Sequence, residues 1–303
     1  MKFLIWCVKI NYGYINMKNR SFISKIVEII LKSTKPKYMD SYSEINEFLT
    51  IKSKEGEKPV KSIFKSRNFN GITIFDFGNV EKSENIIIYV HGGAYVNEIN
   101  YQHLLFCKLL SRKLDAYVLA PVYPLAPLHN AMETFDMFVT LYKEILTEDA
   151  NIILMGDSAG GGFVLSFCQY LKTINLPQPN HIVVFSPWVD ISMSNPPYDS
   201  ENDCILGEIG LREIGKAWAG GLNTKDYRVS PVFGDNKNLP KTMIFAGSGE
   251  IFYKDIKNYV KNLKNSGVDV KFITGDNLFH IYPLFPIPEA KRDFKILKNE
   301  LAD

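Results

Sequence analysis

Short apolar runs typical of β-strands alternate with helical repeats along most of this 303-residue chain. The strand-like runs cover residues 72–75, 86–90, 116–119, 152–155, 182–185, 243–246 and 271–274. Several are apolar at every position, as strands covered on both faces are. The alternation predicts an α/β fold with a mostly parallel central sheet and helices on both of its faces.

Two stretches stand outside the alternation and predict a cap. Residues 1–55 mix helical and polar patterns, and residues 188–228 are rich in Pro, Gly, Asn and aromatic residues without a clear strand. Long insertions beside an active site often form lids. We expect a catalytic domain over residues 56–303 with a cap insertion at about 188–228, and an N-terminal cap segment over 1–55. The alternative, a disordered arm and a surface loop, is disfavoured by large apolar residues such as Trp218.

The charge pattern limits the partners. The chain has 35 basic and 33 acidic residues, a net charge of +2, and no broad basic footprint for nucleic acid. No run reaches the roughly 20 apolar residues that a membrane-spanning helix needs. Apolar residues do repeat at helical spacing over 23–31 among basic residues, a pattern compatible with weak association with a membrane surface. Packing of this stripe onto the protein is the alternative that we favour.

Cysteine usage indicates the compartment. The four cysteines are widely scattered and form no C-x-x-C pair, and they are Cys7, Cys107, Cys168 and Cys204. This spacing argues against a zinc or redox motif and favours a reduced, cytoplasmic setting. The apolar run after Lys2 ends at Lys9, below the length of a secretory core.

The strongest local signal is Gly156-Asp157-Ser158-Ala159-Gly160, a G-x-S-x-G pentapeptide between a strand-like run and a helical repeat. A strand that turns sharply into a helix forces the central serine into a strained conformation, and glycines remove the side chains that would collide there. Ser158 would lie at a helix N-terminus, where amides and the helix dipole favour negative charge. The pattern predicts that Ser158 is a nucleophile.

A second glycine motif follows the run at 86–90. In His91-Gly92-Gly93-Ala94 the main chain can approach a substrate closely, so its amides can donate to the oxygen of a tetrahedral intermediate. We expect an oxyanion hole made by the amides of Gly92, Gly93 and Ala159.

A serine nucleophile needs a base, and the chain has five histidines, which are His91, His103, His129, His181 and His280. His280 follows the last strand-like run, where it can reach the carboxyl edge of a parallel sheet. His181 lies at the start of a strand, His103 begins a helix, and His91 belongs to the glycine motif. The order serine, acid, histidine then selects His280.

The acid of such a triad is expected after the run at 243–246. Glu250 lies there, in Gly247-Ser248-Gly249-Glu250, and would orient the His280 ring and stabilise its charged form. Asp255 is an alternative, although it falls inside a helical repeat and could be a solvated surface residue. Asp276, close to His280 in the sequence, is a further one.

With these motifs, the chain resembles the hormone-sensitive-lipase-like branch of the α/β-hydrolases, which includes many bacterial carboxylesterases. The resemblance covers roughly residues 60–300, as expected for one domain of this size. The residues that carry it are His91-Gly92-Gly93-Ala94, Tyr123-Pro124-Leu125-Ala126-Pro127, Gly156-Asp157-Ser158-Ala159-Gly160-Gly161, Ser186-Pro187-Trp188-Val189-Asp190, Ser230-Pro231 and the Glu250 and His280 loops. It implies the same triad and oxyanion donors, and a helical cap built from the N-terminal segment and the insertion after Trp188.

Three positions depart from that family. Many members have Asp at Glu250, a third glycine at Ala94 and an acidic residue at Leu128. A non-catalytic branch that binds a hormone has lost the histidine, whereas His280 is present here. The expected activity is therefore hydrolysis of small to medium carboxylic esters through an acyl-enzyme, with no metal or organic cofactor. Amidase, deacetylase or lactonase activity, and a ligand-binding protein without catalysis, are the alternatives, and the oligomeric state is open.

Overall fold

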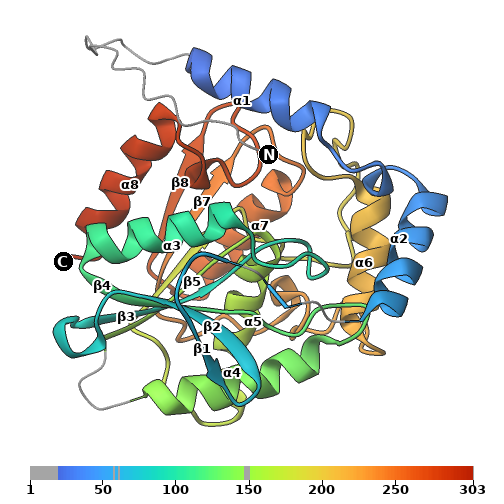
Figure 1. Ribbon diagram of the computed structural model, residues 1–303. Helices are drawn as coiled ribbons and strands as arrows, with labels where there is room; N and C mark the ends of the chain where they lie inside the picture. The colour runs from blue at the N-terminus through green and yellow to red at the C-terminus, as the bar shows by residue number, and fades with distance from the viewer. Residues whose placement is uncertain (1–19, 57–58, 61, 147–150, 303) are drawn as a thin grey trace.

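The computed structural model describes residues 20–56, 59–60, 62–146 and 151–302, in which helices surround one central sheet (Figure 1). The strands are β1 Ser66–Phe69, β2 Ile72–Phe77, β3 Asn85–Val90, β4 Ala116–Pro121, β5 Asn151–Asp157, β6 His181–Phe185, β7 Lys241–Gly247 and β8 Val270–Gly275. The α-helices are α1 Phe22–Ser33, α2 Tyr42–Glu55, α3 Tyr101–Leu114, α4 Ala131–Ile145, α5 Ser158–Thr173, α6 Glu208–Ala219, α7 Tyr253–Asn265 and α8 Pro288–Glu300. Short 3-10 turns are η1 Lys37–Met39, η2 Val80–Lys82, η3 Pro231–Phe233 and η4 Tyr282–Leu284.

The strands lie in the order β1-β2-β4-β3-β5-β6-β7-β8. From β4 to β8 all neighbours are parallel, while β2 pairs antiparallel with both β1 and β4. The predicted α/β fold with a mostly parallel sheet is confirmed. Strand β1 was not predicted, because it is only 4 residues long and half exposed at the edge of the sheet, so it has no apolar run.

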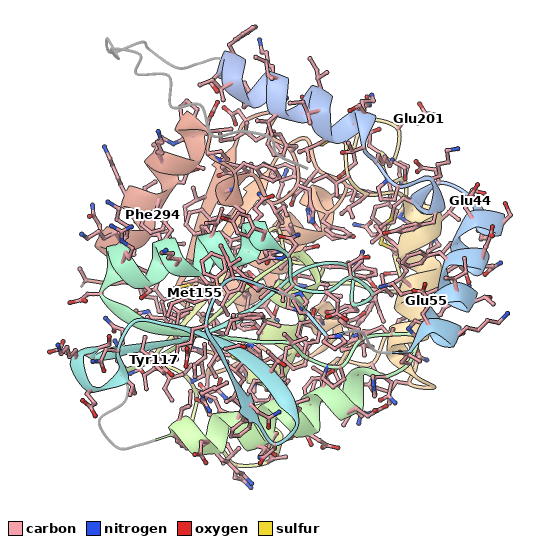
Figure 2. All side chains as sticks on the ribbon, in the orientation of Figure 1. Glu44, Glu55, Tyr117, Met155, Glu201 and Phe294 are labelled. Atoms are coloured by element: carbon pink, nitrogen blue, oxygen red, sulfur yellow. The ribbon has the colours of Figure 1, made fainter. Side chains whose placement is uncertain are left out.

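Alternate residues of the parallel strands enter two separate apolar layers. In β3, Ile88 and Val90 pack in one layer, against α4, α5 and α7, while Ile87 and Tyr89 pack in the other, against α3 and α8. Met155 of β5 lies in the interior, whereas Glu44, Glu55 and Glu201 are exposed (Figure 2). The helices on both faces explain why these strands read as continuous apolar runs.

The N-terminal elements and the insertion after β6 pack against one another. Turn η1 contacts both α2 and α6, and α2 lies beside α6 on the right of Figure 1. The insertion was expected to be irregular, but it contains α6, a 12-residue helix with Gly207 and Gly220 at its ends. In the described part of the chain no helix has the length and apolar character that crossing a membrane requires.

Helix α1 buries only part of its apolar surface on the protein. Ile23, Val27 and Leu31 pack onto a small apolar cluster that includes Leu278 and Phe279. Ile26 and Ile30, which the sequence placed in the same stripe, are exposed. The packing that we favoured for this stripe therefore holds for Ile23, Val27 and Leu31 but not for Ile26 and Ile30.

Candidate active site

The loops that follow five parallel strands meet at one edge of the sheet. Because parallel strands all end at the same edge, the segments after β3, β5, β6, β7 and β8 come together there. Most of the residues selected from the sequence lie in these segments. Their positions relative to one another decide what chemistry the edge can support.

Ser158 forms the turn between β5 and α5. Its φ of 52° lies in the left-handed region, which costs energy for a residue with a side chain. The turn passes close to the end of β3, because a Cβ at Gly160 would collide with the carbonyl oxygen of Val90. The Ser158 side chain thus stands at the first residue of α5, at 5% exposure.

The imidazole of His280 lies against the Ser158 hydroxyl. The distance from Nε2 to the Ser158 Oγ is 2.8 Å, within hydrogen-bond range. The ring is 1% exposed and meets the Phe252 ring edge-on at a centroid distance of 5.3 Å. A neutral Nε2 at this position can accept the hydroxyl proton.

Glu250 lies on the other side of the His280 ring. Its Oε2 is 3.4 Å from His280 Nδ1, an ion-pair distance that is longer than a strong hydrogen bond. The same oxygen accepts a 2.6 Å hydrogen bond from the hydroxyl of Ser186, which in turn accepts one from the amide of Ile281 at 2.9 Å. Ser186 therefore links the loop that holds Glu250 to the loop that holds His280.

Burial and the neighbouring carboxylate act on the pKa of His280 in opposite directions. Burial alone would lower the pKa of His280, but the carboxylate of Glu250 beside Nδ1 outweighs it and raises that pKa above its ordinary value. Asp203 of the insertion also holds the Glu250 loop. Its Oδ2 accepts a 2.9 Å hydrogen bond from the amide of Ile251.

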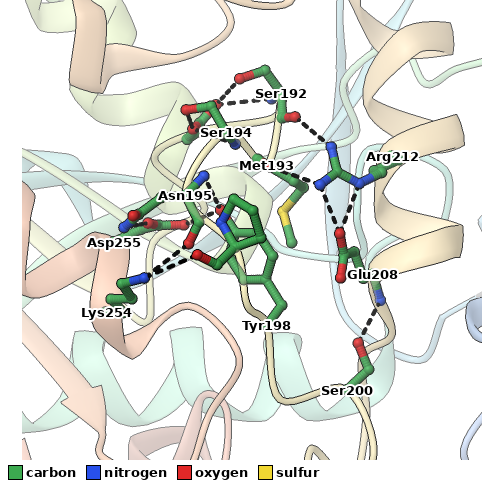
Figure 3. Close-up of polar contacts among 12 residues, drawn as sticks. Ser192, Met193, Ser194, Asn195, Tyr198, Ser200, Glu208, Arg212, Lys254 and Asp255 are labelled. Atoms are coloured by element: carbon green, nitrogen blue, oxygen red, sulfur yellow. Dashed lines mark hydrogen bonds and ion pairs between the residues drawn. The ribbon is translucent and has the colours of Figure 1, made fainter.

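The other acid candidates lie elsewhere. Asp255 is buried rather than solvated, and its two oxygens accept hydrogen bonds from Asn195 at 2.9 Å and from Tyr198 at 2.8 Å (Figure 3). Lys254 beside it donates to two carbonyls of the same loop. These residues anchor the insertion rather than the His280 ring. Asp276 is exposed, with its side chain at the surface.

The structure corrects one expected oxyanion donor. The amide of Gly92 donates to Oδ1 of Asp157 at 3.0 Å and is therefore already paired. The close approach of these segments is the reason, because a Cβ at Gly92 would collide with the Asp157 carboxylate. Among the residues that the structure describes, no acceptor is recorded for the amides of Gly93, Ala94 or Ala159.

A buried polar cluster, absent from the sequence prediction, lies beneath the glycine loop. The Asp157 carboxylate accepts a 2.6 Å hydrogen bond from Tyr89, and His103 Nε2 lies 3.5 Å away. Burial raises the pKa of Asp157, but His103 and the hydrogen bonds of Tyr89 and Gly92 outweigh it and hold that pKa below its ordinary value. The sequence feature that could have indicated this cluster was an acidic residue, Asp157, inside the serine pentapeptide.

His91 supports the glycine motif to which it belongs. Its Nδ1 donates to the carbonyl of Gly92 at 2.6 Å, and its ring stacks on Tyr123 at 4.4 Å. Burial and the neighbouring His103 lower the pKa of His91 to about 3, so the ring is neutral. His91 thus holds the glycine loop without contacting Ser158.

A chain of stacked aromatic rings runs from the insertion to His280. Tyr95 of the glycine loop stacks on Trp218 of α6 at 4.0 Å and on Trp188 at 5.8 Å. Trp188 stacks on Phe252, which meets the His280 ring. These buried rings connect the insertion to the catalytic edge of the sheet.

The model of a family described as alpha/beta hydrolase fold matches residues 87–284, which is more than half of the chain. The chain belongs to this family.

Individual proteins show the same relationship. The chain is 29% identical over 216 residues to a protein named esterase from Acinetobacter venetianus, a match that covers 68% of this chain and 71% of that one. It is 26% identical over 220 residues to an acetyl-hydrolase from Streptomyces hygroscopicus, covering 69% and 73%. A crystal structure of a candidate esterase from Staphylococcus aureus has a TM-score of 0.82 at 24% identity, covering 88% of this chain and 96% of that one. This last likeness shows the fold.

Proposed function

We propose that the chain is a serine hydrolase that cleaves carboxylic esters, with Ser158 as nucleophile, His280 as general base and Glu250 as the orienting acid. The observation that carries the proposal is the 2.8 Å distance between His280 Nε2 and Ser158 Oγ. The names of the relatives, esterase and acetyl-hydrolase, support the same reaction class.

The reaction proceeds in two halves. Ser158 Oγ attacks the ester carbonyl while His280 Nε2 takes the hydroxyl proton, and the collapsing tetrahedral intermediate expels the alcohol, which receives that proton. A water molecule then attacks the acyl group on Ser158, giving its proton to His280, and Ser158 takes the proton back as the acid leaves. Glu250 stays ionised and stabilises the imidazolium of each step.

The oxyanion forms at the glycine loop. Because the Gly92 amide is paired with Asp157, we assign the oxygen of the intermediate to the amides of Gly93, Ala94 and Ala159. Removal of one such donor typically costs about 3 kcal/mol of transition-state stabilisation. Asp157 then has a positioning role, because its bond to Gly92 fixes the loop that carries two of the donors.

The acyl group that fits is small to medium and apolar. The stacked rings of Tyr95, Trp188 and Trp218 join the glycine loop to the insertion, and we expect them to form the apolar wall that the acyl group meets. Trp188 and Trp218 belong to the insertion, and helix α2 packs against α6 of the same insertion. We therefore propose that the insertion at 188–228 and the described part of the N-terminal segment 1–55, residues 20–55, form the cap over a catalytic domain of residues 56–303. Substrate selection lies in this cap.

Turnover of a short-chain nitrophenyl ester tests the proposal. Wild-type protein is expected to hydrolyse it, and Ser158→Ala to lose the activity while the circular dichroism spectrum stays unchanged. A matched anilide of the same acid separates the ester hydrolase proposed here from an amidase. Full activity of Ser158→Ala would contradict the assignment of the nucleophile.

A further inference from the structure

The outward face of α1 combines exposed apolar side chains with lysines. Phe22, Ile26 and Ile29 recur at helical spacing on this face, with exposures of 76%, 43% and 69%. Lys25 and Lys32 are also exposed and flank the apolar residues along one edge. Water-facing apolar residues on one continuous helix face are unfavourable unless a partner covers them.

The helix lies in the most basic part of the chain. Residues 1–37 contain eight basic residues and one acidic residue, Glu28, out of the 35 basic and 33 acidic residues of the whole sequence. Arg20 pairs with Glu28 at 2.5 Å, so this single acidic side chain is neutralised. The charge of the segment therefore suits an anionic partner.

Helix α1 is fixed directly above the catalytic loop. Glu289 of α8 accepts hydrogen bonds from the Ser21 amide at 2.6 Å and from its hydroxyl at 2.9 Å, at the start of α1. Arg20 donates to the carbonyl of Asn277 at 2.9 Å, three residues before His280. The inner face of α1 packs on Leu278 and Phe279 of that loop.

We propose that the outward face of α1 docks on an anionic lipid surface. An interfacial helix places apolar side chains among the acyl chains and lysines among the headgroups, which is the arrangement of Phe22, Ile26, Ile29, Lys25 and Lys32. The cytoplasmic leaflet is anionic and attracts such segments. In the docked protein, helix α1 would lie between the His280 loop and the lipid. The proposal goes beyond ester hydrolysis and does not depend on it.

Co-sedimentation of the full chain with vesicles tests the proposal. The protein is expected to bind vesicles of phosphatidylcholine mixed with phosphatidylglycerol, to bind pure phosphatidylcholine weakly, and to be released by high salt. Ile26→Ser/Ile29→Ser should lower the partition coefficient at least about tenfold, because two fewer apolar side chains are transferred from water into the lipid. Lys25→Glu/Lys32→Glu should lower it by a similar factor, since each lysine contributes about fivefold.

A matched control comes from α3, which exposes Leu105 and Leu109 at 45% and 41%. Leu105→Ser/Leu109→Ser should bind vesicles as the wild type does, and so should Ser158→Ala. All of the surface variants should hydrolyse a soluble ester at the wild-type rate, which shows that they are folded. Equal loss of vesicle binding in the α3 control would overturn the proposal. So would absence of wild-type binding, or self-association of the wild type that Ile26→Ser/Ile29→Ser abolishes without any vesicle binding.

Discussion

The Ser186 hydroxyl donates a 2.6 Å hydrogen bond to Oε2 of Glu250, the oxygen that faces the His280 ring. Ser186 is fully buried and has a φ of 49°, so its backbone is strained at the end of β6. Residues that keep such a conformation are held by their surroundings. Here those surroundings are the loops that carry the proposed acid and base.

Removal of the Ser186 hydroxyl tests its part in positioning Glu250. Ser186→Ala should lower kcat about 10-fold to 100-fold, the value of one hydrogen bond to a charged group, with little change in KM. Ser186→Gly relieves the positive φ and should lower kcat to the same extent. Steady-state kinetics check both variants, and wild-type kcat in either one would show that Glu250 needs no such support.

The identity of the acid is tested by two amide substitutions. Glu250→Gln should lower kcat by about 10² to 10⁴, because the imidazolium loses its counter-charge and its orientation. Asp255→Asn should leave kcat nearly unchanged, because Asp255 binds Asn195 and Tyr198 rather than His280. The opposite ranking in the same ester assay would transfer the acid role to Asp255.

The pH profile follows from the raised pKa of His280. The base acts only when neutral, so kcat/KM is high above this pKa and falls as the pH decreases through it. Because Glu250 raises the pKa, the wild-type fall should lie above the ordinary value of about 6.5. In Glu250→Gln no carboxylate opposes the effect of burial on the pKa of His280, so the fall in kcat/KM should move to lower pH. If the acidic limb of the pH profile stayed in place or moved to higher pH, Glu250 would not act on this imidazole.

The fit between the glycine loop and Ser158 is tested by one added methyl group. In Gly92→Ala the new Cβ would collide with the Asp157 carboxylate and lie 3.0 Å from the Ser158 Cβ, so the two segments must separate. We expect a loss of kcat/KM of about 10² or more, equal to one misplaced oxyanion donor. Kinetics with a thermal melt measure the effect, and a folded variant with wild-type kcat/KM would contradict it.

Much of this site could be predicted because parallel strands end at one edge. Ser158, Glu250 and His280 each follow an apolar run, and the sheet order alone brings those three ends together. The fold class was readable for the same reason, since strands buried on both faces give uninterrupted apolar segments.

The rest depends on contacts that no periodicity records. The pairing of the Gly92 amide with Asp157 is a long-range hydrogen bond. Because of it, the oxyanion donors that we assign to the glycine loop are the amides of Gly93 and Ala94 rather than those of Gly92 and Gly93. Asp255 reads as a surface residue of α7, yet Asn195 and Tyr198 of the insertion cover it. Helix α6 was missed because glycine at both ends and at Gly210 and Gly215 resembles a loop.

The most direct measurement is mass spectrometry of the intact protein and its peptides after reaction with a fluorophosphonate. An activated serine should give a single adduct on the peptide that contains Ser158, formed much more slowly in His280→Ala and absent in Ser158→Ala. An adduct at another residue, or an unlabelled Ser158 in protein that still hydrolyses esters, would contradict the account.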